Sequence, residues 1–131
     1  MTNKTMTFAT LREANITRIP KFRNKKGELV HNSDGSNWGL SAWSNAVLGE
    51  LGELANLIKK IERGDFTLDE IRQECAKECA DVQTYLDILA FRLGIDLGQA
   101  TVDKFNEVSD RVNAGVYITL DNDIEKVKLI K

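Results

Sequence analysis

The sequence predicts an all-α fold, an antiparallel helical bundle that is completed by oligomerisation. Three observations carry this prediction: apolar residues recur at the helical period over long stretches, a glycine closes each stretch, and only a few residues connect the two longest stretches. A chain of 131 residues can bury a core of its own or with a twin. We expect one domain over residues 1–131, with a core at 40–113, an N-terminal helix and loop at 1–38 and a tail at 114–131.

Composition argues against several classes of partner. The formal net charge is -2 and residues of both signs are interspersed, so bulk charge indicates neither a nucleic-acid nor a membrane surface. No apolar run approaches the roughly 18 residues of a membrane-spanning helix, and the polar N-terminus lacks the apolar stretch of a secretory signal. We therefore expect a cytoplasmic protein with no membrane and no nucleic-acid partner.

The cysteines and the histidine are expected to have no metal-binding role. Cys75 and Cys79 lie one turn apart on the apolar side of a helical pattern, which favours reduced core thiols over a disulfide or a zinc site. His31, the only histidine, lies in a loop-like stretch, and we expect it at the surface rather than as a ligand.

The N-terminal part combines a short helix with a long loop. Residues 8–15 can form a helix that turns Phe8 inward. From Pro20 onward polar residues and glycine dominate, and neither a helical nor a strand period survives. Loops of this length are usually functional or mobile, and the loop at 20–38 leads directly into the first long helix.

The first long helix is expected over about residues 41–63. Glu50 and Glu53 lie one turn apart at the margin of its apolar stripe, where like charges repel and desolvation raises their cost. They therefore indicate neutralising cations, either metal ions or Lys and Arg. Gly49 and Gly52 each cost the helix about 1 kcal/mol, which indicates close approach of either another helix or a ligand. The apolar stripe consists of Val47, Leu51, Leu54, Ile58 and Ile61.

The second long helix repeats this arrangement. Thr67 and Glu70 form a capping box at its start, and Gly94 ends it after Leu93. The short connection at 64–66 makes the two long helices antiparallel neighbours, so their acidic flanks can face each other. The apolar stripe contains Ile71, Cys75, Val82, Leu86, Leu89 and Leu93. The polar flank contains Glu74, Glu78, Asp81 and Tyr85.

A third helix is expected from a cap at Asp96 to about Asn113. Lys104 and Arg111 lie on one flank of its inward face and could reach a phosphate. Local pairing, for instance of Arg111 with Glu107, is the alternative. The inward face consists of Leu97, Phe105, Val108 and Val112.

The tail and the broad apolar stripes both bear on assembly. Beyond Gly115, residues 116–120 have strand propensity but no partner strand, so they form an edge segment or an arm onto a second subunit. Residues 126–131 are expected to be loosely held. Because we do not expect three such helices to cover one another fully, we predict a homodimer or a dimer of dimers.

The paired acids of the two long helices predict a cation site. Acid pairs at this spacing are common in a chain with 20 acidic residues, but these pairs lie mid-helix, beside apolar stripes, on neighbouring helices. A site of oxygen ligands alone takes a hard cation, so Mg²⁺ is expected, with Mn²⁺ as a substitute. The predicted ligands are Glu50, Glu53, Glu78 and Asp81.

Two stretches, GELGELANLIKK and KECADVQTYLDILAFRLGIDL, resemble the MazG-like branch of the all-α nucleoside triphosphate pyrophosphohydrolases. The family signature is E-x-x-E, a spacer and E-x-x-D, which the four predicted ligands match. The resemblance covers about residues 40–113. It implies an enzyme that hydrolyses a nucleoside triphosphate to the monophosphate and pyrophosphate by water attack at the α-phosphorus. It also implies Mg²⁺ on the four acids, with Glu50 and Glu53 among the catalytic carboxylates.

The resemblance implies substrate contacts as well. KFNEVSDR, from Lys104 to Arg111 and including Asn106, looks like the family's third-helix substrate-binding segment. In this comparison Lys104 and Arg111 grip the β- and γ-phosphates. Tyr85 resembles an aromatic position that some members use near the sugar. Val108 replaces a second asparagine of that segment, which weakens any inference of strict dUTP specificity.

Other candidate substrate contacts match no motif of the family. Lys59 and Lys60, at the end of the first long helix, are additional candidates for the phosphates. Trp38 or Trp43 could stack on the base, but Trp43 lies four residues before Val47 on the apolar stripe, which favours a core role. The alternative to an enzyme is a catalytically silent helical module that senses nucleotides or mediates oligomerisation.

Overall fold

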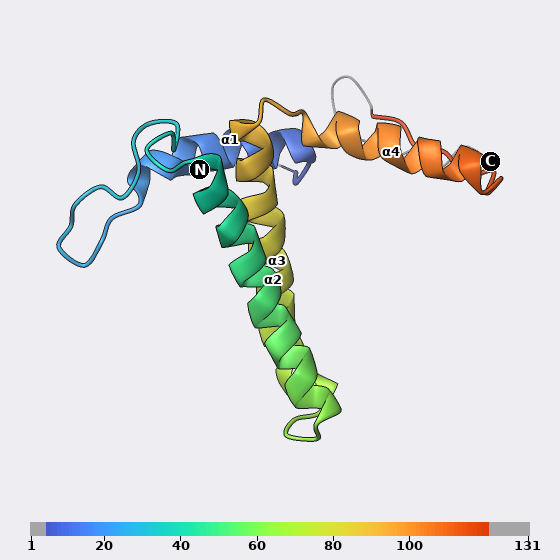
Figure 1. The fold of residues 1–131 in the computed structure, drawn as a ribbon, viewed down its shortest axis with the longest axis horizontal. Coiled ribbons are helices and arrows are strands. Elements are labelled where there is room, and N and C mark those ends of the chain that lie inside the picture. Colours follow the sequence, from blue (N-terminus) through green and yellow to red (C-terminus); the bar gives the residue numbers. More distant parts are fainter. Residues whose placement is uncertain (1–4, 121–131) are drawn as a thin grey trace.

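The computed structural model describes residues 5–120, and the regular structure of this part of the chain is helical, which confirms the predicted all-α class. Two long helices form a hairpin, and the other elements lie at its open end (Figure 1). The elements are α1 (Phe8–Arg18), a short 3₁₀ helix η1 (Ile19–Lys21), α2 (Leu40–Glu62), α3 (Leu68–Arg92) and α4 (Leu97–Arg111).

The α2–α3 hairpin is antiparallel, as the short connection predicts (Figure 1). Gly64 closes the turn with a φ of 86°, a left-handed conformation that glycine adopts at little cost. The Thr67 hydroxyl accepts a hydrogen bond from the Glu70 amide, and the Glu70 carboxylate accepts one from the Thr67 amide. These two bonds confirm the predicted capping box and fix where α3 begins.

The face of α2 that packs on α3 is rotated from the predicted stripe toward the acidic flank. Leu51 and Ile58 remain 48% and 45% exposed, whereas Glu50 is half-buried. A side chain built on Gly49 or Gly52 would meet nothing within 4 Å, so nothing in the described part of the chain approaches these glycines closely. Within residues 5–120, α3 is the only helix that packs along α2, and the side of α2 that carries Leu51 and Ile58 stays open.

α1 lies across the open end of the hairpin and is held there by a buried acid of α3. Asp87, which is 1% exposed, accepts a hydrogen bond from Arg12 Nε at 3.1 Å and another from Asn15 Nδ2 at 2.9 Å. A buried carboxylate is costly unless it is paired and hydrogen-bonded, so these bonds fix α1 on α3. The helix reaches Arg18, one turn beyond the predicted end at residue 15.

A small core forms where η1, α2 and α3 meet. Trp43 is 1% exposed and clusters with Ile19 and Ile88. Its indole N–H donates a hydrogen bond to the Gly35 carbonyl at 3.0 Å, which ties the loop before α2 to the core. Trp43 is therefore a core residue here, as its position four residues before the apolar stripe favours.

His31 is buried rather than at the surface, so the sequence-based expectation is wrong. Its ring centroid lies 4.6 Å from that of Trp38 and 5.0 Å from that of Trp43. The loop after η1 folds back over the start of α2 and carries His31 into this aromatic cluster. The loop has no sequence period, so its burial could not be read from a pattern.

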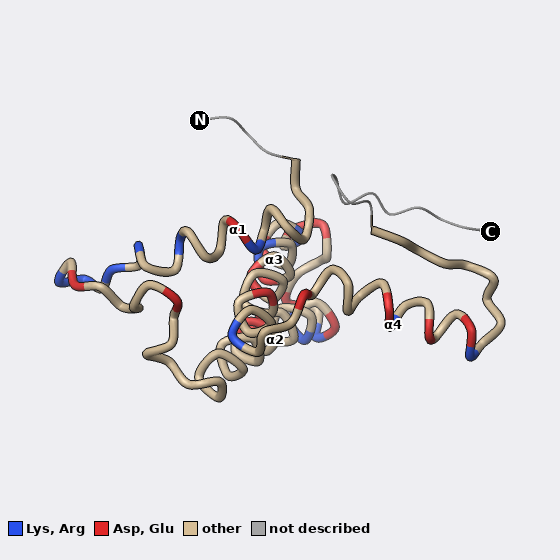
Figure 2. Tube along the Cα trace, turned by 90° about the horizontal axis from the view of Figure 1, so that it is seen from above, with Lys and Arg blue, Asp and Glu red and all other residues tan. Residues whose placement is uncertain are grey.

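α4 leaves the hairpin instead of packing along it. Figures 1 and 2 show it extending from the end of α3 as an arm. Its start is capped by Asp96 as predicted, but it ends at Arg111, and Asn113 takes the left-handed conformation with a φ of 53°. Phe105 and Val112 of the predicted inward face are 42% and 60% exposed. The expected cover for this face is not provided within residues 5–120.

The segment at 116–120 lies against α4. The Asn106 side chain donates to the Ile118 carbonyl and accepts from the Ile118 amide, both at 2.9 Å, and Tyr117 donates to Asp110. These bonds hold the strand-like segment on the arm of its own chain. The predicted loose end, residues 126–131, lies outside the described residues.

Two remaining predictions concern the cysteines and membranes. Both cysteines are free thiols, as expected, but Cys79 is exposed and only Cys75 is half-buried, so the expectation of two core thiols is wrong for Cys79. Among the helices between residues 5 and 120, none is long and apolar enough to cross a lipid bilayer.

Candidate metal centre

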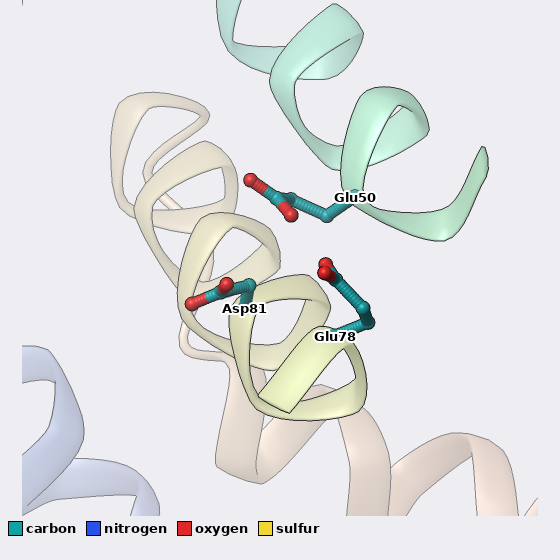
Figure 3. Close-up of side chains that lie close together, drawn as sticks. All are labelled: Glu50, Glu78 and Asp81. Carbon is teal, nitrogen blue, oxygen red and sulfur yellow. The ribbon is translucent and has the colours of Figure 1, made fainter. Parts of the chain in front are cut away.

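Three carboxylates converge between the two long helices. Glu50 projects from α2 toward Glu78 and Asp81 on α3 (Figure 3). Each residue offers an oxygen, and these oxygens all lie within 4.8 Å of one another. Glu78 and Asp81 share a side of α3 because they are three residues apart, and Glu50 faces them because the packing face of α2 is rotated toward its acidic flank. We call these residues the carboxylate trio.

The charges of the trio are not neutralised by any side chain in the described part of the chain. No lysine or arginine among the described residues forms an ion pair with Glu50, Glu78 or Asp81. Glu78 Oε2 is buried and has no hydrogen-bond partner. A buried acceptor without a partner costs free energy, so the site lacks the positive charge that would stabilise it.

The pKa values reflect this missing charge. Desolvation by burial raises the pKa of Glu50 to about 7, with further contributions from a hydrogen bond with Glu78 and from the neighbouring negative charges, Glu53 first. Desolvation also raises the pKa of Glu78. A hydrogen bond with Glu50 opposes this shift, and interactions with Glu53 and Asp81 add to it. Both carboxyl groups therefore hold a proton more tightly than usual, and a bound cation would replace that proton.

Glu53, the fourth predicted ligand, is exposed and lies outside the trio, yet it is close enough to Glu78 to raise the pKa of that carboxyl.

The residues present fit a hard divalent cation. Every donor is a carboxylate oxygen, one of them is a buried acceptor without a partner, and two helices position them. Glu50, Glu78 and Asp81 would hold the ion, with Glu53 at the margin.

Of the predicted substrate contacts, Tyr85 lies beside the trio. It lines a cavity of about 180 Å³ together with Asp81, and the charges of Glu50 and Asp81 contribute to raising its pKa after desolvation. Trp43 does not share this position, because its ring is enclosed in the core and no face is open to a ligand. Lys60 lies ten residues beyond Glu50 on α2, which is about 15 Å along the helix axis.

The predicted contacts on α4 are remote from the trio within one chain. The C-terminal end of α3 lies eleven residues beyond Asp81, about 16 Å along the axis, and α4 then leads away (Figure 1). Lys104 Nζ pairs locally with Glu107 at 2.5 Å, Asn106 is bonded to Ile118, and Arg111 is exposed. Local pairing therefore occurs on α4, but Glu107 pairs with Lys104 and not with Arg111, the partner given as the example.

Two residues that sequence reasoning missed lie at the same cavity, Arg18 at the end of α1 and Phe22 after η1. Neither belongs to a motif, and α1 is only weakly amphipathic, so no pattern placed them near the acids of α3. The packing of α1 by Asp87 brings them there. The cavity is lined by Arg18, Phe22, Asp81, Thr84, Tyr85 and Ile88.

A larger cavity, of about 620 Å³, lies between α1 and the junction of α3 with α4. Its buried acid is Asp87, whose two oxygens are already bonded to Arg12 and Asn15. Glu13 and Asp96 also line this cavity, but within residues 5–120 only the trio brings three candidate ligands together, so the candidate centre remains the trio.

Comparison with known proteins finds a similar phage protein. No protein-family model and no solved structure matches the chain. The Gene 37 protein of Mycobacterium phage L5 is 34% identical over 80 residues, which cover 60% of this chain and 70% of the phage protein. At that identity and coverage, the chain belongs to the same family as the Gene 37 protein of Mycobacterium phage L5.

Proposed function

We propose that the protein is a Mg²⁺-dependent nucleoside triphosphate pyrophosphohydrolase that releases the nucleoside monophosphate and pyrophosphate. The observation that supports this most strongly is the carboxylate trio, whose three oxygens lie within 4.8 Å of one another and have no ion-pair partner among residues 5–120. Divalent cations held by a few carboxylates commonly take substrate phosphates as their remaining ligands. The resemblance to MazG-like enzymes supports the same reaction.

In this proposal each acidic side chain has a role that follows from its position. Glu50, Glu78 and Asp81 hold the cation, and bound Mg²⁺ supplies neutralisation of the triphosphate and a lowered pKa for water. Glu53, at the margin of the trio and exposed, is free to accept the proton of the attacking water. Attack at the α-phosphorus breaks the bond to the β-phosphate, so pyrophosphate leaves as one unit.

A second copy of the chain completes the site in this proposal. The open side of α2 exposes Leu48 and Leu51, and α4 carries an apolar groove of about 630 Å³ that includes Phe105 and Val108. Exposed apolar surfaces of this extent are usually covered by a partner. If α4 of one copy crosses the hairpin of another, its Lys104 comes within reach of phosphates at the partner's trio.

The test is an incubation of the purified protein with Mg²⁺ and each ribo- and deoxyribonucleoside triphosphate in turn, with pyrophosphate measured separately from orthophosphate. Pyrophosphate and monophosphate in equal amounts are expected. Orthophosphate alone would mean a different reaction at the same acids, and no release from any triphosphate would contradict the enzymatic proposal. Light scattering of the active protein tests the assembly, because a fully active monomer would contradict the shared site.

The second candidate is a non-catalytic module that senses nucleotides or mediates oligomerisation. The observation that favours it is the uncovered apolar surface of α2 and α4, which fits an assembly role without catalysis. It predicts nucleotide binding or self-association without turnover. The incubation above separates the two candidates.

A further inference from the structure

The cavity of about 180 Å³ beside the trio has the dimensions of a site for one ring system. Pockets for drug-sized ligands usually measure about 300–1,000 Å³, so a whole nucleotide does not fit in it. Phe22 and Tyr85 contribute aromatic rings to its lining, and Ile88 adds an aliphatic side chain. Asp81 belongs both to this lining and to the trio, so a ring in the cavity lies next to the candidate metal centre.

Arg18 is the one cation in the lining, and its donors are free. The guanidinium carbon lies 5.5 Å from the centroid of the Phe22 ring, a cation–π contact that orients the plane of the group. Within residues 5–120 the side chain of Arg18 makes no hydrogen bond and no ion pair, although the acid Asp81 lines the same cavity. An oriented guanidinium presents pairs of parallel N–H donors and no acceptor.

This combination defines which ring the cavity would take. Aromatic walls favour a flat heteroaromatic ring, and a guanidinium fork selects an edge with two adjacent acceptors. Among purines, guanine offers such an edge with O6 and N7, whereas adenine offers N7 beside an amino group that only donates. Arginine and adenine would therefore present two donors to each other at one position.

We propose that this cavity binds the nucleobase of the substrate and that Arg18 selects guanine over adenine through O6 and N7. The inference rests on the proposed function, since it places the base of the same nucleotide whose phosphates lie at the trio. It names Arg18, from α1, as a specificity-determining residue. Asp87 acts on it indirectly, because the buried pair with Arg12 positions α1 over α3.

The experiment is a calorimetric titration of GMP, IMP and AMP into the full-length protein in the presence of Mg²⁺. IMP shares O6 and N7 with GMP but lacks the 2-amino group, so it isolates the edge that Arg18 would read. GMP and IMP are expected to bind at least about tenfold more tightly than AMP. In Arg18→Ala this ratio should fall to about one.

Two further variants separate base reading from simple charge. Arg18→Lys keeps the positive charge but not the paired N–H donors of the guanidinium. It should therefore retain part of the affinity for all three nucleotides but no longer bind GMP and IMP more tightly than AMP. Arg72→Ala removes an exposed arginine near the far end of α3 and should leave the ratio unchanged. All these side chains are at the surface, so the variants are expected to fold.

Three results would overturn the inference. They are AMP binding as tightly as GMP to the unaltered protein, no binding of any of the three, and a loss in Arg18→Ala that is equal for all three. The last would identify Arg18 as a phosphate contact. A base ratio that depends on Arg18 in a protein that releases no pyrophosphate would remove the proposed reaction and keep the base site. If the protein releases pyrophosphate but Arg18→Ala leaves the ratio of GMP to AMP affinity unchanged, the proposed reaction stands and the base site is wrong.

Discussion

Helix α3 carries two acidic sites that differ in whether the fold supplies partners for their carboxylates. Asp87 is almost fully enclosed, and both of its oxygens accept hydrogen bonds from side chains of α1. Glu78 and Asp81, about two turns earlier, meet Glu50 of α2, and no lysine or arginine between residues 5 and 120 forms an ion pair with them. The first site is paired within the fold, whereas the charges of the second have no ion-pair partner in the described part of the chain.

The contrast explains why one acid is structural and the other is a candidate for function. A carboxylate that the fold neutralises contributes to stability and has no remaining bonding capacity. Carboxylates that the fold brings together without neutralising store an unfavourable interaction, which a bound cation relieves. The same helix can therefore anchor α1 and hold a ligand.

The largest expected effect is on stability, at Asp87, whose carboxylate is hydrogen-bonded within the fold. Asp87→Ala leaves Arg12 and Asn15 without their buried acceptor and should lower the free energy of unfolding by about 3–5 kcal/mol. Chemical denaturation followed by tryptophan fluorescence measures it. Asp69→Ala, which removes an exposed acid of α3, is the control and should cost no more than about 0.5 kcal/mol. A loss below about 1 kcal/mol in Asp87→Ala would show that the network does not anchor α1.

The next largest effect is expected on turnover, at the carboxylate trio. Glu78→Gln should reduce pyrophosphate release at least about a hundredfold, equivalent to about 2.7 kcal/mol of barrier, because one ligand oxygen of the trio loses its charge. Glu74→Gln, one turn away and exposed, is the matched control and should retain activity. Equal losses in the two variants would contradict the assignment of the trio.

A smaller effect is expected from pH in the absence of divalent cations. The pKa of Glu50 is raised from 4.5 to about 7 in the folded state, so between these values the folded protein holds more protons than the unfolded chain. Stability then falls as pH rises through this window. After allowance for solvent screening we expect a decrease of about 1–2 kcal/mol from pH 5 to pH 8.

Melting curves in EDTA across this range test the prediction, and Glu50→Gln should flatten the pH dependence. A melting temperature that rises steadily from pH 5 to pH 8 would mean that repulsion within the trio does not matter.

The smallest effect distinguishes the two sites by sign. Without metal at pH 8, Glu50→Gln should raise the free energy of unfolding by about 1 kcal/mol, because it removes one of the repelling charges. Asp87→Asn should lower it, because the pair with Arg12 loses its charge. Urea denaturation of both variants under the same conditions gives the comparison. Destabilisation by Glu50→Gln would place Glu50 in the same class as Asp87.

The sequence was most informative where a local rule decides the structure. The capping box at Thr67, the stops at Gly64 and Gly94 and the acid spacing on α2 and α3 all depend on residues within a few positions of one another. The helical period and the short connection predicted that the acidic flanks of α2 and α3 can face each other, and Glu50, Glu78 and Asp81 do converge, although Glu53 does not join them. These features required no knowledge of distant contacts.

The remaining features depend on contacts between distant segments. Arg18 reaches the cavity only because Asp87, far along the chain, anchors α1. His31 is buried because an aperiodic loop folds back over α2. α4 was expected to turn one face inward, yet its helical period specifies only which residues share a face and not which surface that face meets.

The most direct test of the central claim is a calorimetric titration of Mg²⁺ into the metal-free protein at pH 7, repeated in buffers of different ionisation enthalpy. We predict saturable binding with proton release, because the cation displaces the proton that the raised pKa of Glu50 retains, and we predict that Glu78→Gln abolishes it. Absence of saturable binding, or unchanged binding in Glu78→Gln, would contradict the assignment of the trio as a metal centre.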